Sequence, residues 1–125
     1  DREAMRALYR SCDVLLLPSR SEGFPNTLLE AMAAALPVLA APVGAIPEVI
    51  EDGVQGMLIE HGDGEGYARA VERLARDPRL RHSMGQAGYE TVMRDYLRDH
   101  VFAHYGEIWR ELIGRRSSRI RRVRT

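Results

Sequence analysis

Two glutamates, Glu22 and Glu30, lie with seven residues between them in the stretch from Ser19 to Met32. Apolar residues at helical spacing begin within this interval, and the unpaired N–H groups at a helix start favour an anion such as phosphate. A carboxylate would repel a phosphate, so the two glutamates are better suited to hydroxyl groups on either side of it. The spacing therefore indicates a phosphate that carries two polyols, as in a nucleotide sugar.

The elements on either side of these glutamates are a strand and a helix. Residues 13–17 are a short apolar run stopped by Pro18, which predicts a strand buried on both faces of a parallel sheet. Pro25 stiffens the approach to the helix, and Asn26 or Thr27 can cap it. The helix itself is indicated by Leu28, Leu29, Met32 and Leu36. In open α/β sheets ligands bind at the carboxyl ends of the strands, where this junction falls.

A purely structural interpretation fits the same residues. The run from Thr27 to Glu30 matches the Ser/Thr-x-x-Glu capping box, in which the glutamate serves the helix start rather than a ligand. Glu22 would then be a solvated loop charge. Taken without their surroundings, the two carboxylates leave both interpretations open.

At these residues the sequence resembles the retaining glycosyltransferases of family 4, the glycosyl transferases group 1. Their motif also has two glutamates separated by seven residues, in an E-G-F-P/G…L-E-A-M context, and further matching segments follow in order to about residue 113. The resemblance implies that Glu22 lies nearest the reacting sugar as the catalytic residue and that Glu30 binds the ribose hydroxyls. The sugar and phosphate loop would comprise Gly23, Phe24, Pro25, Asn26, Thr27 and Leu28.

The resemblance also implies a fold and a mechanism. Family members have two Rossmann-like lobes with the active site between them, known as the GT-B fold. Residues 1–114 are then the carboxyl-terminal, nucleotide-sugar-binding lobe, truncated at its amino end, and the acceptor lobe is missing. The expected reaction is transfer with retention of configuration, for which this part alone is inactive. No metal or other cofactor is expected, because cationic side chains and helix-start amides would neutralise the diphosphate.

The rest of the chain predicts more of an α/β lobe. Residues 2–11 form an amphipathic helix, and Val38–Ala40 and residues 57–59 are further short strands. Right-handed crossovers of a parallel sheet are the simplest topology, with one unpaired edge where upstream strands would pair. Ala45 stands where the family has a second adjacent glycine, so this loop is expected to differ locally. A short helix is expected to begin at Pro47 and Glu48.

Turn signals divide the second half of the chain. Asp63, in a glycine-rich run without P-loop residues, is expected to cap a helix. Asp77 followed by Pro78 indicates a stop and a new helix start. Between them, a helical stripe is expected at Ala68, Val71, Leu74 and Ala75. His100 and His104 share a helix face but lack further ligands, so a zinc site is not expected.

Composition bounds location and partners. Cys12 is the only cysteine and no apolar run is long enough to span a membrane, which together favour a cytoplasmic protein. The chain has no lysine, and six of its 18 arginines crowd residues 115–125. This Arg-rich tail is either solvated or holds an anionic membrane surface. Outside this tail the chain has 12 arginines against its total of 18 acidic residues, and this acidic balance disfavours specific nucleic-acid binding.

An apolar stripe on residues 101–113 needs a partner surface, so self-association is expected. The function favoured by the sequence is the donor-binding part of a retaining glycosyltransferase. The alternative is a noncatalytic nucleotide-binding or interaction module.

Overall fold

The computed structural model describes residues 1–20 and 26–96. The expected α/β architecture is confirmed: three parallel strands lie in the order β1-β2-β3 and helices flank them. The strands are β1 (Leu15–Leu17), β2 (Val38–Ala40) and β3 (Gly56–Leu58). Leu15 and Gly56 both pair with Val38, so the three strands lie side by side and begin at the same level. Their carboxyl ends therefore meet at one edge of the sheet, where ligands bind in folds of this class.

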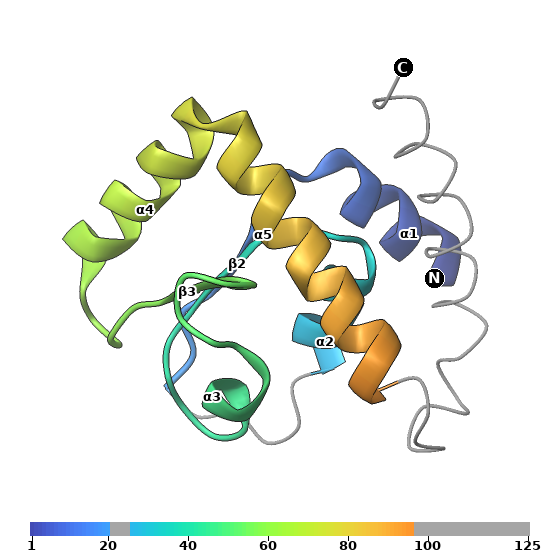
Figure 1. Cartoon of the computed structure of the whole chain (residues 1–125), viewed down its shortest axis with the longest axis horizontal. Helices are drawn as coiled ribbons and strands as arrows, with labels where there is room; N and C mark the ends of the chain where they lie inside the picture. The colour runs from blue at the N-terminus through green and yellow to red at the C-terminus, as the bar shows by residue number, and fades with distance from the viewer. Residues whose placement is uncertain (21–25, 97–125) are drawn as a thin grey trace.

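The helices follow the order expected from the turn signals. They are α1 (Arg2–Ser11), α2 (Asn26–Ala33), α3 (Ile46–Val49), α4 (Gly64–Arg76) and α5 (Pro78–Thr91), with a π-helical turn η1 (Val92–Tyr96) continuing α5. Figure 1 shows α5 crossing the middle of the molecule, with α1 and α4 on opposite sides of it. Asp63 caps α4 as predicted, and Asp77 caps α5 at the predicted helix start, accepting bonds from the N–H groups of Gly66 and Leu80.

The central strand divides the core into two faces. Val38 and Ala40 pack with α2 and α3, while Leu39 packs with α4 and with Met84 of α5. This alternation is the period-two pattern of a strand covered on both sides. A third, smaller cluster places Tyr9 of α1 against the back of α2.

Three predictions about local structure were wrong in detail. Residues 13–17 were expected to be a strand buried on both faces, but β1 is an edge strand and Leu16 is 46% exposed. The third strand covers Gly56–Leu58 rather than residues 57–59. On α4 the buried residues are Tyr67, Ala70 and Leu74, and Ala68, Val71 and Ala75 are exposed. The buried face of α4 begins at Tyr67, whose ring packs into the core. It therefore starts one residue earlier than the expected stripe.

The close approach of α5 to the end of α2 depends on two unusual backbone positions. Ala35 ends the turn after α2 with a φ of 53°, in the left-handed region. Gly85 of α5 packs directly on it, because a Cβ at position 85 would overlap the carbonyl oxygen of Ala35. This contact anchors α5 against the helix that carries Glu30.

Candidate functional site

Of the eight catalytic and donor-binding candidates, four lie within the described part of the chain. Glu22, Gly23, Phe24 and Pro25 fall outside it, as do His100, His104, the 101–113 stripe, the 114/115 boundary and the Arg-rich tail. Asn26, Thr27, Leu28 and Glu30 all lie on the first turns of α2, which follows the carboxyl end of β1.

The start of α2 differs from the predicted cap. The helix already includes Asn26 and Thr27, so neither residue precedes it as an N-cap, and the Thr27–Glu30 capping box is not formed. The Leu28 side chain is fully buried in the core, so any ligand contact from this residue must come from its backbone. The first N–H groups of a helix have no acceptor within it, so the start of α2 offers backbone donors that suit an anion.

Glu30 is half-buried and forms a side-chain contact that the sequence did not predict. The hydroxyl of Tyr9, on α1, donates a hydrogen bond of 2.7 Å to Oε2 of Glu30. A carboxylate accepts about four hydrogen bonds, so Glu30 keeps acceptor capacity for a ligand hydroxyl. The Glu30 carboxylate therefore accepts a hydrogen bond from a core tyrosine and keeps further acceptor capacity toward the surface. The capping interpretation does not include this contact.

A basic pair lies at the same edge of the sheet. Arg20 and His61 each follow a strand by three residues, Arg20 after β1 and His61 after β3. Nε of Arg20 donates to Nε2 of His61 at 3.0 Å, so the pair links the loops on either side of β2. This hydrogen bond requires His61 to be neutral at Nε2. Sequence reasoning missed the pair, although the position of both residues just past strand ends was a usable signal.

The loop after β2 completes this edge. Gly44 has a φ of 55°, whereas Ala45 has a φ of −81° and an ordinary right-handed conformation at the start of α3. The Cβ that distinguishes Ala45 from glycine therefore causes no backbone strain here. The short helix expected at Pro47 and Glu48 is confirmed, with Glu48 in its first turn.

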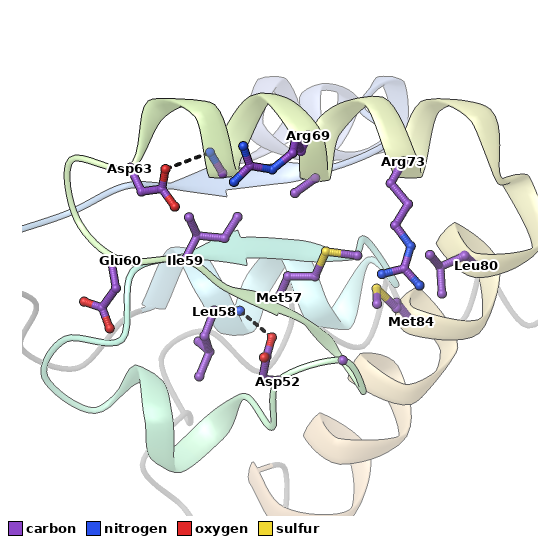
Figure 2. A pocket seen from close by; sticks show the side chains of 13 residues that line it. Asp52, Met57, Leu58, Ile59, Glu60, Asp63, Arg69, Arg73, Leu80 and Met84 are labelled. Atoms are coloured by element: carbon purple, nitrogen blue, oxygen red, sulfur yellow. Dashed lines mark hydrogen bonds between the residues drawn. The ribbon is translucent and has the colours of Figure 1, made fainter.

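A groove lies elsewhere among the described residues, between α4, β3 and the start of α5. It encloses about 530 Å³ and has Met57, Leu80 and Met84 on its floor. Figure 2 shows Arg73 reaching from α4 toward Leu80 and Met84, with Arg69 beside it on the same helix. Among the described residues singled out as donor-binding, Asn26, Thr27, Leu28 and Glu30, none lines this groove.

Two of the three carboxylates that line this groove, Asp52 and Asp63, have roles in the fold, and the third is Glu60. Asp52 accepts the N–H of Leu58 at 2.9 Å, and Asp63 accepts the N–H of Gly66 at the start of α4 (Figure 2). The first bond satisfies a donor on the edge strand β3, and the second caps α4. The groove is therefore a weaker candidate for donor binding than the carboxyl edge of the sheet.

Within residues 1–20 and 26–96, no three His, Cys, Asp or Glu side chains gather closely enough to hold a metal ion. Among the same residues, no helix is both long enough and apolar enough to cross a membrane.

Comparison with known proteins places this geometry in a family. The family model described as "Glycosyl transferases group 1" matches residues 1–91. A D-inositol 3-phosphate glycosyltransferase from Thermobifida fusca (strain YX) is 42% identical over 80 residues, which are 64% of this chain and 18% of that relative. The chain spans less than a third of the length of the curated relatives that it matches.

Solved structures agree with the fold. The C-terminal domain of a glycosyl transferase group 1 family protein (LpcC) from Francisella tularensis matches with a TM-score of 0.72 and 35% identity, covering 77% of this chain and 49% of that one. Anabaena Alr3699/HepE, in complex with UDP-glucose, matches with a TM-score of 0.67 and 26% identity, covering 89% of this chain and 29% of that one. The parallel sheet flanked by helices is thus that of the C-terminal domains of such glycosyltransferases, and this chain belongs to the glycosyl transferases group 1 family.

Proposed function

We propose that this chain binds the nucleotide-diphosphate sugar in a retaining glycosyltransferase. The observation that carries the proposal is the place of Glu30, on the first turns of α2 at the carboxyl edge of a parallel sheet. There a half-buried carboxylate belongs to a helix whose first N–H groups have no acceptor within the helix. This combination suits a ligand that carries hydroxyl groups beside a phosphate, as the ribose diphosphate of a nucleotide sugar does.

The similarity to Anabaena HepE supports the same ligand class, because that protein is in complex with UDP-glucose. In our proposal Glu30 accepts hydrogen bonds from the ribose hydroxyls. The amides of residues 26–29 face the diphosphate, and Arg20, held by His61, adds positive charge at the same edge. These groups would neutralise the diphosphate without a bound metal.

The reaction breaks the bond between the sugar anomeric carbon and the diphosphate oxygen. Negative charge develops on the departing nucleoside diphosphate, and donors already in place stabilise it without reorganisation. The acceptor oxygen bonds to the anomeric carbon from the same face, so the anomeric configuration is retained, and its proton passes to the departing diphosphate oxygen. We assign Glu22, by the family motif alone, to electrostatic stabilisation and positioning of the sugar.

Calorimetric titration with UDP, GDP and ADP tests the proposal, both on this chain and on the natural polypeptide that carries it. We expect one of the three nucleotides to bind best and Glu30→Ala to remove most of that binding. The matched control is Glu72→Ala, which removes an exposed glutamate paired with Arg76 on α4. Equal affinities in the two variants would refute the role of Glu30. Binding without any turnover of nucleotide sugars, unaffected by Glu22→Ala in the natural polypeptide, would favour the noncatalytic module.

A further inference from the structure

Tyr9 and Glu30 are joined across 21 residues of sequence by the hydrogen bond of 2.7 Å between α1 and α2. The tyrosine is only 5% exposed, and its neighbours are Ala31, Ala34 and Leu36. Cys12 and Leu15 pack against the same cluster. A ring enclosed in this way has little freedom, so its hydroxyl presents a hydrogen-bond donor at a fixed point beside α2.

The chemistry of the contact makes it directional. Burial first, and then the hydrogen bond to Glu30 and the charge of that carboxylate, raise the pKa of the Tyr9 hydroxyl far above its ordinary value. The hydroxyl therefore remains protonated and always acts as the donor. Glu30, with three side-chain torsions, would otherwise sample several rotamers, each of which points its oxygens differently. One fixed donor on Oε2 selects among them.

We propose that Tyr9 is a positioning residue for donor recognition, which holds the Glu30 carboxylate in the orientation that accepts the ribose hydroxyls of the nucleotide. The inference rests on the proposed function and extends it to a residue of α1, outside the loop and helix of the two-glutamate motif. Tyr9 itself does not touch the nucleotide in this proposal. Its effect is to remove the entropy cost of ordering Glu30 when ligand binds.

A comparison within the molecule supports this role. Tyr67 is the other tyrosine in the described core, and its hydroxyl donates to the main-chain carbonyl of Ile59 at 3.4 Å. Such a bond satisfies a buried hydroxyl without involving any surface group. The Tyr9 hydroxyl instead bonds a half-buried side chain at the proposed ligand edge. Tyr67→Phe is therefore a matched control that removes the same oxygen from another part of the core.

The test compares ribose with deoxyribose ligands. Affinities of UDP and 2′-deoxy-UDP, and of the corresponding adenine and guanine pairs, are measured by calorimetry for wild type, Tyr9→Phe, Tyr67→Phe and Glu30→Ala. We expect wild type to prefer the ribonucleotide. Tyr9→Phe should lose roughly two- to tenfold in ribonucleotide affinity, the cost of ordering one side chain, and less for the deoxy analogue, which offers Glu30 only its 3′-hydroxyl. Tyr67→Phe should behave as wild type with both.

Two outcomes would overturn the inference alone. Tyr9→Phe could retain the full preference for ribose while Glu30→Ala loses it, or it could weaken both ligands equally, as a general loss of packing would. A different pattern would overturn the proposed function as well: wild type shows no preference for ribose, and Glu30→Ala binds as wild type does. Denaturation midpoints of all the variants verify that each one is folded, which the retained ring of Tyr9→Phe favours.

Discussion

A buried tyrosine whose hydroxyl donates a hydrogen bond is present on two sides of this molecule, in α1 beside α2 and in α4 beside β3, but the acceptors differ. On each side a buried tyrosine donates from its hydroxyl, Tyr9 to the carboxylate of Glu30 and Tyr67 to the carbonyl of Ile59. Figure 1 shows the helices that carry these tyrosines, α1 and α4, on opposite sides of α5. The acceptor decides the consequence: a main-chain carbonyl only completes the core, whereas a half-exposed carboxylate can also serve a ligand.

The acidic residues on the two sides differ in the same way. Around β3 and α4, Asp52 and Asp63 each accept a main-chain N–H, which uses the carboxylate to stabilise an edge strand and a helix start. Glu30 is instead oriented by another side chain. A carboxylate used to cap the backbone is fixed by local geometry, while one held by a distant side chain is available for recognition. The comparison indicates that β3 and α4, on the side of Tyr67, serve as scaffold. In our proposal α1 and α2, on the side of Tyr9, form the ligand site.

The largest expected effect lies on the scaffold side. Leu74→Ala removes a fully buried side chain of α4 and should lower the free energy of unfolding by about 2–5 kcal/mol, through lost burial and the cavity left behind. Nucleotide affinity of the protein that remains folded should not change. Urea denaturation measures the first quantity and calorimetry the second. A substantial change in affinity per folded molecule would contradict the separation of scaffold and site.

A double-mutant cycle between Tyr9 and Glu30 gives the next largest effect. Glu30→Leu leaves the Tyr9 hydroxyl buried without its acceptor, so we expect a loss of about 1–3 kcal/mol in unfolding free energy. Adding Tyr9→Phe removes the orphaned hydroxyl, and the double variant should lose less than the sum of the single ones. Tyr67→Phe breaks a longer bond and should cost no more than about 1 kcal/mol. Strictly additive losses of unfolding free energy at positions 9 and 30 would show that the two side chains have no coupling energy.

The sequence was sufficient where structure is set locally. The caps at Asp63 and Asp77 depend on side chains that reach N–H groups three residues ahead, and such bonds can be predicted from spacing. The bond between Tyr9 and Glu30 and the pair of Arg20 with His61 span 21 and 41 residues. They form only because the sheet and its helices bring distant segments together. The periodicity of the sequence does not predict which distant residues will meet. The exposure of Leu16 likewise follows from strand order rather than from composition.

The smallest effect appears only at alkaline pH, and it again separates the two tyrosines. Burial alone raises the pKa of Tyr67, whereas burial, the bond to Glu30 and the charge of Glu30 together raise the pKa of Tyr9. In an absorbance titration of the folded protein, the phenolate of Tyr9 should therefore form after that of Tyr67, and Tyr9→Phe should remove the later step.

The same shift has a consequence for stability, and its sign can be worked out. The folded state keeps the Tyr9 proton to a higher pH than the unfolded chain, whose tyrosines have the ordinary pKa of 10.0. The contribution of this hydroxyl to stability is then complete below pH 10 and is lost as the pH rises further, because unfolding releases the proton. Wild type should lose stability more steeply than Tyr9→Phe above this pH. Parallel curves for the two proteins would mean that neither burial nor Glu30 raises the pKa of this hydroxyl in the folded state, and the distinction between the two sides would then rest on the exposure of the acceptors alone.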